Sequence, residues 1–236
     1  MSKILVMIPA FNEEESILLT LKDLTDHVPD YDYVVINDCS TDSTKEILRS
    51  HGVNFVDLPV NLGIGGGVQT GYRYALEHGY DIAIQFDGDG QHDARYLPDL
   101  VSAIQSGGCD IAIGSRFIKR EGFQSSAMRR LGINILSGLI RILCGTRVYD
   151  VTSGMRAANQ KMIAHFVREY AQDYPEPEAI LSAAMAGAVI GEVPVEMRER
   201  QGGVSSINPM RSVYYMLKVS IALILSRMTL KRGGKR

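Results

Sequence analysis

The sequence predicts an α/β fold built on a mostly parallel sheet with helices on both faces. Short apolar, β-branched runs alternate with segments of helical hydrophobic spacing throughout the first half of the chain. The links between them are short, which is typical of strand–helix–strand units. Ligands of such sheets bind beyond the carboxyl ends of the strands, so the polar residues that follow each strand are candidates for a functional site.

The elements of the first half follow one another in order. Apolar runs predict strands at 4–8, 33–36, 53–58, 82–86 and 111–113. Hydrophobic spacing predicts helices at about 14–26, 41–50, 65–78 and 94–106. Asn12, followed by three glutamates, predicts a capped, acid-rich start of the first helix, and Ser40 predicts the same for the second.

Two segments of the second half have the pattern of helices that lie on a membrane surface. Residues 126–143 carry arginines beside an apolar stripe at helical spacing, although a core helix with arginines is an equal alternative. That stripe consists of Met128, Leu131, Ile135, Leu139 and Ile142. The apolar run 213–225 is shorter than the about 20 residues that cross a bilayer. It lies in a tail that has seven basic and no acidic residues from Arg211 onward. An interfacial helix fits this tail, and a helix packed on the core with a solvated basic end is the alternative.

Composition excludes several classes of protein. Hydrophobic residues make up 45% and charged residues 22% of the 236 residues, which excludes disordered and collagen-like chains. The net charge of −2 argues against a nucleic-acid-binding protein. The three cysteines, Cys39, Cys109 and Cys144, form no CxxC motif, so we expect neither a disulfide framework nor a zinc site, and we expect a reducing compartment. The apolar run before Pro9 predicts a first strand rather than a signal peptide.

The sharpest chemical signal is the pair Asp87 and Asp89. Both carboxylates follow an apolar strand and are flanked by glycines, and Gln91 adds a neutral oxygen. Oxygen ligands of this kind suit Mg²⁺ or Mn²⁺, with open positions that phosphates can fill. An Asp-x-Asp pair alone is common in turns, so the interpretation as a metal site depends on the position of this pair at the end of a strand.

Two further positions follow predicted strands. The glycines at 63–67 lack the spacing of a dinucleotide fingerprint. They predict a helix start that comes close to a ligand base or a neighbouring strand, with a flexible turn as the alternative. Asp38 is suited to accept hydrogen bonds from the N–H edge of uracil or guanine, or to cap the next helix.

These residues fall into six ordered motifs. They are 8–14 (IPAFNEE), 37–42 (NDCSTD), 61–63 (NLG), 87–92 (DGDGQH), 114–116 (GSR) and 152–156 (TSGMR). Over nearly its whole length the sequence resembles family 2 glycosyltransferases with the GT-A fold. It is most similar to the polyprenyl-phosphate glycosyltransferases, the group that contains dolichol-phosphate mannose synthase. The resemblance implies a catalytic domain at 1–206, with a candidate interface-helix insertion at 116–147, and a basic amphipathic helix and tail at 207–236.

The resemblance also implies roles for single residues. The nucleotide-sugar site would comprise Pro9, Ala10, Asn12, Glu13, Asp38, Gly65, Asp87, Gly88, Arg200 and Ser205. The catalytic residues would be Asp87, Asp89, Arg116 and Arg156, with Asp89 and Gln91 as metal ligands. The acceptor phosphate would lie against Ser115, Arg116, Ser153 and Arg156. Glu178 is a candidate for contacts with sugar hydroxyls.

The activity that the resemblance implies is inverting transfer of a sugar from a nucleotide sugar to the phosphate of an undecaprenyl or dolichyl lipid. UDP-glucose or UDP-N-acetylglucosamine is the favoured donor, GDP-mannose is the alternative, and Mg²⁺ or Mn²⁺ is the cofactor. A polysaccharide acceptor, with Glu178 or Asp150 as base, and a non-catalytic donor-binding subunit are the competing hypotheses. Expected partners are the membrane surface, a small membrane protein and a second copy of the chain, with no nucleic acid. The expected location is peripheral, on the cytoplasmic face of the membrane.

Overall fold

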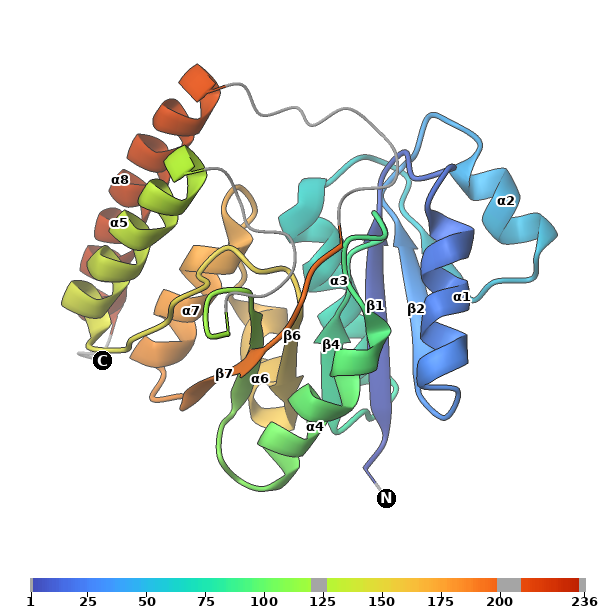
Figure 1. Cartoon of the computed structure of the whole chain (residues 1–236), viewed down its shortest axis with the longest axis horizontal. Coiled ribbons are helices and arrows are strands. Elements are labelled where there is room, and N and C mark those ends of the chain that lie inside the picture. Colours follow the sequence, from blue (N-terminus) through green and yellow to red (C-terminus); the bar gives the residue numbers. More distant parts are fainter. Residues whose placement is uncertain (1, 120–126, 199–208, 234–236) are drawn as a thin grey trace.

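A computed structural model describes residues 2–119, 127–198 and 209–233. Within these ranges a seven-stranded sheet has the order β3-β2-β1-β4-β6-β5-β7, with helices on both faces (Figure 1). The strands are β1 (Ile4–Ala10), β2 (Asp32–Asn37), β3 (Phe55–Asp57), β4 (Ile82–Gln85), β5 (Ile111–Ser115), β6 (Arg156–Asn159) and β7 (Ile190–Pro194). The predicted α/β fold class is confirmed, as are the five strands and four helices of the first half.

The helices are distributed between the two faces of the sheet. One face is covered by α1 (Ile17–His27), α2 (Thr44–Ser50) and α4 (Leu97–Gln105), which follows a 3₁₀ turn at Ala94–Tyr96. The other is covered by α3 (Gly63–Glu77), α6 (Gln160–Arg168) and α7 (Pro175–Met185), with α5 (Ala127–Cys144) and α8 (Pro209–Gly233) packed beside α7. Burial of alternate residues on opposite faces of β1, β4 and β5 produces these two cores.

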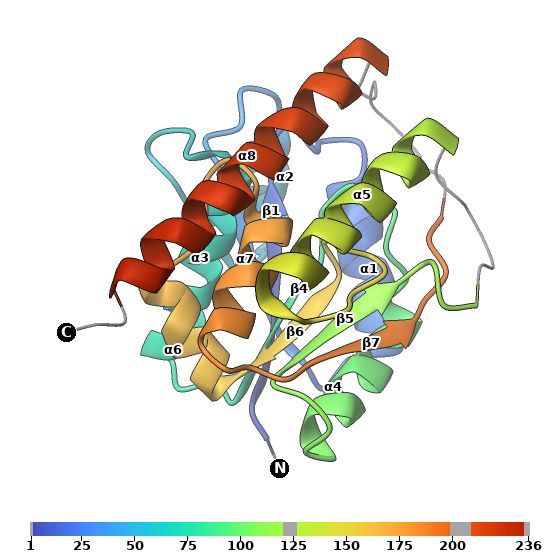
Figure 2. The same cartoon turned by 90° about the vertical axis from the view of Figure 1, so that its left-hand side faces the viewer.

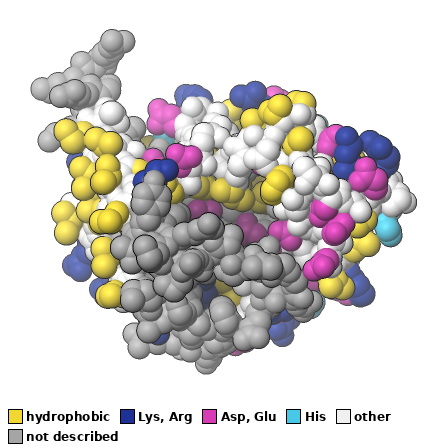
Figure 3. All heavy atoms as spheres, turned by 90° about the horizontal axis from the view of Figure 1, so that it is seen from above, with side chains coloured by type: hydrophobic (Ala, Val, Ile, Leu, Met, Phe, Trp, Pro, Cys, Tyr) yellow, Lys and Arg dark blue, Asp and Glu magenta, His cyan; other side chains and the backbone are white. Residues whose placement is uncertain are grey.

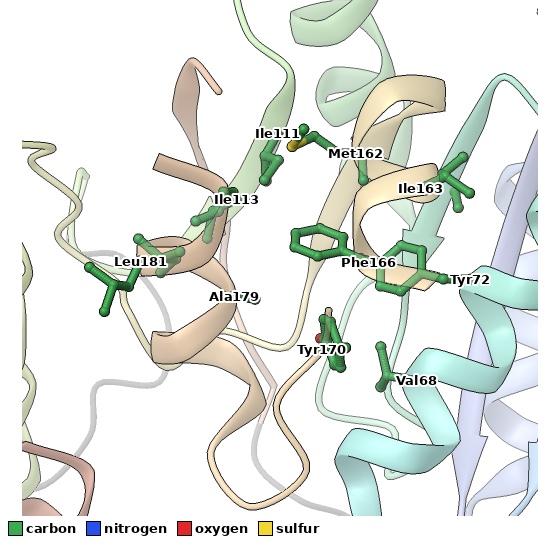
Figure 4. Close-up of a cluster of buried hydrophobic side chains, with 14 of the residues drawn as sticks. Val68, Tyr72, Ile111, Ile113, Met162, Ile163, Phe166, Tyr170, Ala179 and Leu181 are labelled. Atoms are coloured by element: carbon green, nitrogen blue, oxygen red, sulfur yellow. The ribbon is translucent and has the colours of Figure 1, made fainter. Parts of the chain in front are cut away.

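The core of the α3 face is rich in aromatic rings. Tyr72 of α3 packs against Phe166 of α6 and against Tyr170 just beyond it, with ring centroids 5.0 and 5.5 Å apart (Figure 4). Burial of rings of this size stabilises the contact between the two helices by several kcal/mol in order of magnitude. This packing sets the position of α3 and of the chain that leads into α7.

The sequence does not predict β6. This strand makes the sheet mixed instead of all parallel. β6 lies between β4 and β5 and is antiparallel to both, whereas every other pair is parallel. Arg156 opens this strand opposite Gln85 and Ile113. A short segment with a buried arginine at its start lacks the apolar alternation by which strands are recognised.

The predicted helix caps are wrong. Asn12 has a positive φ of 58°, and its side chain accepts a hydrogen bond from Thr41 N, while Asn12 N donates to Ser40 Oγ. These bonds join the loops after β1 and β2 instead of capping helices. The start of α2 is held by Asp42, whose carboxylate accepts from Thr44 N at 3.0 Å.

Both predicted interface segments are helical, and they pack against each other (Figure 2). α5 buries Ile133, Leu136 and Ile140 in the core. One face of α5 is therefore that of a core helix, which was the alternative prediction. α8 likewise buries Val219 and Leu223. In the described part of the chain, neither these helices nor any other has the length and apolar composition needed to span a bilayer.

Candidate active site

A cleft of about 380 Å³ opens at the carboxyl ends of β1, β2 and β4. Figure 3 looks onto this end of the molecule, where acidic side chains border a hollow. The lining contains four carboxylates, from Glu13, Asp38, Asp87 and Asp89, and no lysine or arginine among the described residues. The other lining residues are Pro9, Ala10, Phe11, Asn61, Gly63, Ile64, Gly67 and Gly88. Most of the residues predicted for the nucleotide-sugar site therefore meet in one place.

The turn that carries Asp87 and Asp89 is anchored to α1. Ser16 Oγ and Thr20 Oγ1 donate hydrogen bonds to Gly88 O at 2.9 and 3.1 Å, and both side chains are buried. Sequence reasoning missed Ser16 and Thr20, because hydroxyls at the start of a helix are indistinguishable from ordinary helix residues before the fold is known. Their two bonds fix the backbone between the two carboxylates.

The carboxylate of Asp87 is enclosed on several sides. Gln85 Nε2 donates to Oδ1 at 3.1 Å, and His92 Nε2 lies 3.1 Å from Oδ2. A Cβ on Gly154 would overlap this carboxylate, which explains why glycine stands there. Desolvation works to raise the pKa of Asp87, but the bonds from His92 and Gln85 and the charge of Arg156 outweigh it and keep the pKa below its ordinary value. Asp87 is therefore a fixed, ionised group.

Asp89 and Gln91 stay the predicted ligands of a divalent cation, although Gln91 is not among the residues that line the cleft. Asp89 lines the cleft, and its Oδ1 accepts a hydrogen bond from Gln91 N at 3.0 Å. No three His, Cys, Asp or Glu side chains converge into a complete metal site within the described residues. Mg²⁺ is commonly bound by one or two carboxylates together with substrate phosphates, and this donor set fits that arrangement.

Asp38 shapes the far end of the cleft. Its carboxylate accepts a hydrogen bond from Leu62 N at 2.7 Å, and its carbonyl accepts one from Asn61 Nδ2. Asp38 thus holds the loop that leads into α3, while its side chain also lines the cleft. It does not cap α2, which was the alternative role.

The glycines at the start of α3 have separate tasks. Gly63 has a φ of 74° and lines the cleft together with Gly67. Gly65 is not among the lining residues, and a Cβ there would overlap the carbonyl oxygen of Ala171 and lie 2.5 Å from Gln172 Cα. The expectation for Gly65 is corrected accordingly: it permits close packing of a neighbouring backbone.

Asn12 also needs correction. It is absent from the lining of the cleft, and its side chain holds Thr41 in the loop after β2. Glu13 remains at the cleft, with its carboxylate 2.7 Å from Ser16 Oγ.

Arg116 is engaged inside the protein. Its Nε and Nη2 donate to the two carboxylate oxygens of Asp150 at 2.7 and 2.6 Å, and Nη2 also donates to Thr152 Oγ1. Arg116 is 6% exposed and Asp150 fully buried, so this ion pair joins the end of β5 to the segment before β6. A contact of Arg116 with an acceptor phosphate stays a prediction.

Arg156 is buried, which does not suit its predicted contact with the acceptor phosphate. It is 1% exposed, its Nε and Nη2 donate to Ser153 O, and its Nη1 donates to Glu176 O at 3.1 Å. In this arrangement it cannot touch an acceptor phosphate, and it acts on the site through its charge. Ser115 and Ser153 are also buried, with hydroxyls that have no partner among the described residues.

The remaining predicted residues lie elsewhere. Arg200 and Ser205 fall outside the described residues. Arg198, the last residue described before them, donates from its backbone N to Gln91 O at 2.9 Å. Glu178 is directed away from the cleft, because its carboxylate accepts a hydrogen bond from Ser226 of α8. The expected contact of Glu178 with sugar hydroxyls is therefore wrong.

Comparisons with known proteins agree with this geometry. The family model described as glycosyl transferase family 2 matches residues 5–166. The chain is 30% identical over 215 residues to an undecaprenyl-phosphate mannosyltransferase of Micrococcus luteus, covering 87% of this chain and 88% of that one. It is 30% identical over 216 residues to a UDP-N-acetylglucosamine–dolichyl-phosphate N-acetylglucosaminyltransferase of Methanococcus voltae, covering 82% and 84%.

A solved structure has the same fold. Glucosyl-3-phosphoglycerate synthase from Mycobacterium tuberculosis, in complex with Mn²⁺, UDP-glucose and phosphoglyceric acid, superimposes with a TM-score of 0.73. At 22% identity the alignment covers 96% of this chain and 79% of that one, which confirms the GT-A fold class. The predicted resemblance to polyprenyl-phosphate glycosyltransferases is confirmed by the named relatives. The six motifs, the acidic cleft and the family match together establish that this chain belongs to glycosyl transferase family 2.

Proposed function

We propose that this protein transfers a sugar from a nucleotide sugar to the phosphate of a polyprenyl lipid at a membrane surface. The observation that carries the proposal is the cleft that combines an apolar end, at Pro9 and Phe11, with the carboxylate pair Asp87 and Asp89. A base and ribose suit the apolar end, and a diphosphate suits the carboxylates once a cation is present. UDP-glucose and UDP-N-acetylglucosamine remain the favoured donors and GDP-mannose the alternative, and the names of two relatives support N-acetylglucosamine and mannose as candidate sugars.

The negative charge of the cleft requires a cation when a diphosphate binds there. Four carboxylates would repel a diphosphate, and no basic side chain among the described lining residues offsets them. Asp89 and Gln91 would hold Mg²⁺ or Mn²⁺, which supplies neutralisation of the charge that develops on the leaving diphosphate. Arg198, the last residue described before Arg200 and Ser205, lies beside Gln91, and the assignment of Arg200 and Ser205 to the diphosphate stays a prediction.

The acceptor phosphate needs no strong base. By analogy with phosphoserine its second pKa is near 6, so near neutral pH it is largely a dianion. Direct attack on the anomeric carbon then inverts that carbon. The guanidinium carbons of Arg116 and Arg130 lie 5.3 and 5.5 Å from the centroid of the Phe117 ring, which makes Arg130 a further candidate for phosphate binding.

A lipid acceptor also accounts for the exposed apolar surface of α5 and α8. We call this set the α5/α8 surface: Leu131, Ile135, Ile142, Leu217, Ile221, Ile224, Leu225 and Met228, each at least 42% exposed. The N-terminal ends of both helices lie at the same end of the molecule as the cleft (Figure 1). Peripheral attachment through this surface, on the cytoplasmic face, would hold the acceptor close to the donor.

The carboxylates suggested for a polysaccharide acceptor have other partners. Asp150 is paired with Arg116, and Glu178 with Ser226, so neither supports that alternative. A small membrane-protein partner and a homo-oligomer stay predictions.

The test is direct. Purified protein with Mn²⁺ and membranes that contain polyprenyl phosphate is given a panel of radiolabelled donors: UDP-glucose, UDP-N-acetylglucosamine and GDP-mannose. The expected result is an organic-extractable, acid-labile product with one preferred donor. Asp89→Ala abolishes turnover without unfolding the protein, because it removes a ligand of the cation.

Asp99→Ala is the matched control, since Asp99 is exposed in the first turn of α4. Full turnover by Asp89→Ala would overturn the metal assignment. Transfer to a soluble glycan in place of the lipid phosphate would overturn the acceptor.

A further inference from the structure

We propose that Arg198 is a positioning residue of the cation site. Together with two aspartates, it holds the turn that carries Asp89 and Gln91 in place and so increases the affinity of that turn for a divalent cation. The two aspartates are Asp23 of α1 and Asp93 at the end of the turn, and we call the three residues the Arg198 cluster. This inference rests on the proposed function and deepens it. All three residues lie outside the six sequence motifs.

One face of α1 supports the turn at both ends. Near the start of the turn, Gly88 O accepts hydrogen bonds from Ser16 Oγ and Thr20 Oγ1. Beyond its end, Ala94 N donates to Asp23 Oδ2 at 2.9 Å. Residues 16, 20 and 23 are four and three positions apart, which places their side chains on the same side of the helix. The backbone of the turn is therefore attached to α1 before and after the predicted metal ligands.

Arg198 adds a third attachment, from the chain that follows β7. Its backbone N donates to Gln91 O at 2.9 Å, and Gln91 N donates to Asp89 Oδ1 at 3.0 Å. Its Nη2 donates to Asp23 Oδ1 at 3.0 Å and lies 3.0 Å from Asp93 Oδ2. A single residue thus joins α1 to the end of the turn through its side chain and holds the middle of the turn through its backbone.

Neutralisation of Asp93 alone does not account for Arg198. The Asp93 side chain is 3% exposed, and Arg95 already binds its carboxylate through Nε and Nη2. Within the described residues the side chain of Arg95 donates to Asp93 only, and it stays 61% exposed. Arg95 therefore supplies a counter-charge inside the turn, whereas Arg198 connects the turn to α1.

Arg198 has two effects of opposite sign on a cation at Asp89. Its positive charge repels the cation, but the two carboxylates that pair with it offset most of this repulsion. Its attachment of the turn raises the affinity, because ligands that are already in place lose less conformational freedom when the cation binds. Groups that orient metal ligands typically contribute about tenfold or more to metal affinity, so we expect the positioning effect to dominate.

The experiment measures the cation directly. Arg198→Met removes the guanidinium, Arg198→Lys keeps a positive charge, and Arg95→Met is the matched control. Binding of Mn²⁺ is measured by calorimetry in the presence of the nucleoside diphosphate of the preferred donor. Amide hydrogen exchange at Gln91 and Ala94 is measured in the metal-free protein, and urea unfolding checks that each variant is folded.

We expect Arg198→Met to bind Mn²⁺ about tenfold more weakly and to exchange both amides faster than the wild type. At saturating Mn²⁺ its kcat should return to the wild-type value, because the ligands themselves are intact. Arg198→Lys should recover part of the affinity, since an ammonium group restores the charge without the planar geometry. Arg95→Met should bind Mn²⁺ as the wild type does.

Asp23→Asn tests the Arg198 cluster from the side of α1. It keeps the size of the side chain and should also weaken Mn²⁺ binding, and in combination with Arg198→Met it should add little, because both changes remove the same connection. Unchanged or tighter Mn²⁺ binding in Arg198→Met and Asp23→Asn would overturn this inference alone. So would an equal loss in Arg95→Met, which would indicate that the charge balance of Asp93 sets the affinity. Failure of the wild type to bind Mn²⁺ with either UDP or GDP would overturn the metal assignment of the proposed function, and this inference with it.

Discussion

At the scale of single residues, the site depends on side chains that orient Asp87 rather than on Asp87 alone. His92 is 3% exposed and places Nε2 at 3.1 Å from the carboxylate, with its ring against Phe86 at a centroid distance of 5.6 Å. A carboxylate fixed by such neighbours loses little entropy when a ligand binds. His92 is therefore a positioning residue.

His92→Phe should lower kcat/KM by about tenfold, because it keeps the packing and removes one hydrogen bond to a charged group. His92→Gln keeps a donor and should recover most of the activity. Steady-state kinetics of both variants, with thermal unfolding as a check of folding, measure the effect. Equal activity of His92→Phe and wild type would exclude the positioning role.

Asp93 links the same loop to the pH dependence of stability. Burial works to raise its pKa, but hydrogen bonds from Arg95 and the charges of Arg198 and Arg95 outweigh it and lower the pKa to about 2. A lowered folded-state pKa stabilises the protein above the unfolded-state value of 3.8, and this stabilisation is lost as the pH falls towards 2.

Asp93→Asn should therefore lose about 2 kcal/mol of stability at pH 7 and flatten the acid limb of the stability curve. Urea unfolding between pH 7 and pH 2 measures both. Asp26→Asn is the control, because Asp26 belongs to an exposed pair with Lys22 that contributes little. A curve for Asp93→Asn that parallels the wild type would contradict the assigned pKa.

At the scale of elements, close backbone packing fixes α3 beside the cleft. Gly65 faces the backbone of Ala171 and Gln172 without space for a Cβ, whereas a Cβ on Gly138, exposed in α5, meets no atom within 4 Å. Both glycines lie within helices, so intrinsic helix propensity favours alanine at each.

Gly65→Ala should destabilise the protein by about 1–3 kcal/mol, since backbone cannot move aside as a flexible side chain can. Gly138→Ala should stabilise it by up to about 1 kcal/mol. Thermal or urea unfolding measures the difference. The opposite order of stability would show that the packing of α3 on the 171–172 backbone is not the constraint.

The first five strands and their helices could be predicted because each strand is an apolar run of several residues between polar turns. β6 and β7 could not, because Arg156 and Glu192 interrupt any such run, and their burial depends on partners that are distant in sequence. The same limit applies to the site. Asp87 and Asp89 are two residues apart and recognisable as a pair, whereas Ser16 and His92 acquire their roles only through contacts that folding creates. The predicted contacts of Arg116 and Arg156 with an acceptor phosphate take no account of Asp150 or the carbonyl of Glu176, because the sequence does not reveal that these groups lie beside the two arginines.

At the scale of the whole molecule, the proposed membrane contact would be made by the α5/α8 surface, whose two helices begin at the same end of the molecule as the cleft (Figure 1). The exposed apolar residues of α8 recur at 217, 221, 224, 225 and 228, which is one continuous face of a helix. Those of α5 recur at 131, 135 and 142, and the two helices are in contact. An exposed apolar surface of this kind, with Arg141 and Lys218 beside it, is suited to the headgroup region of a bilayer.

The double variant Ile135→Ser, Ile221→Ser should lower binding to vesicles by about tenfold or more, because each substitution removes apolar area that the bilayer would bury. Both side chains are more than half exposed, so the fold should be unaffected. Co-flotation with vesicles that contain anionic lipid measures the binding, and transfer to a water-soluble, short-chain polyprenyl phosphate should stay at the wild-type rate. Transfer to a long-chain acceptor in the same vesicles should fall in step with binding. Leu19→Ser is the matched control, because Leu19 is 55% exposed on α1, on the opposite face of the sheet. If the double variant and Leu19→Ser bind vesicles equally well, the lipid acceptor is reached by another part of the molecule, and the α5/α8 surface has a different partner.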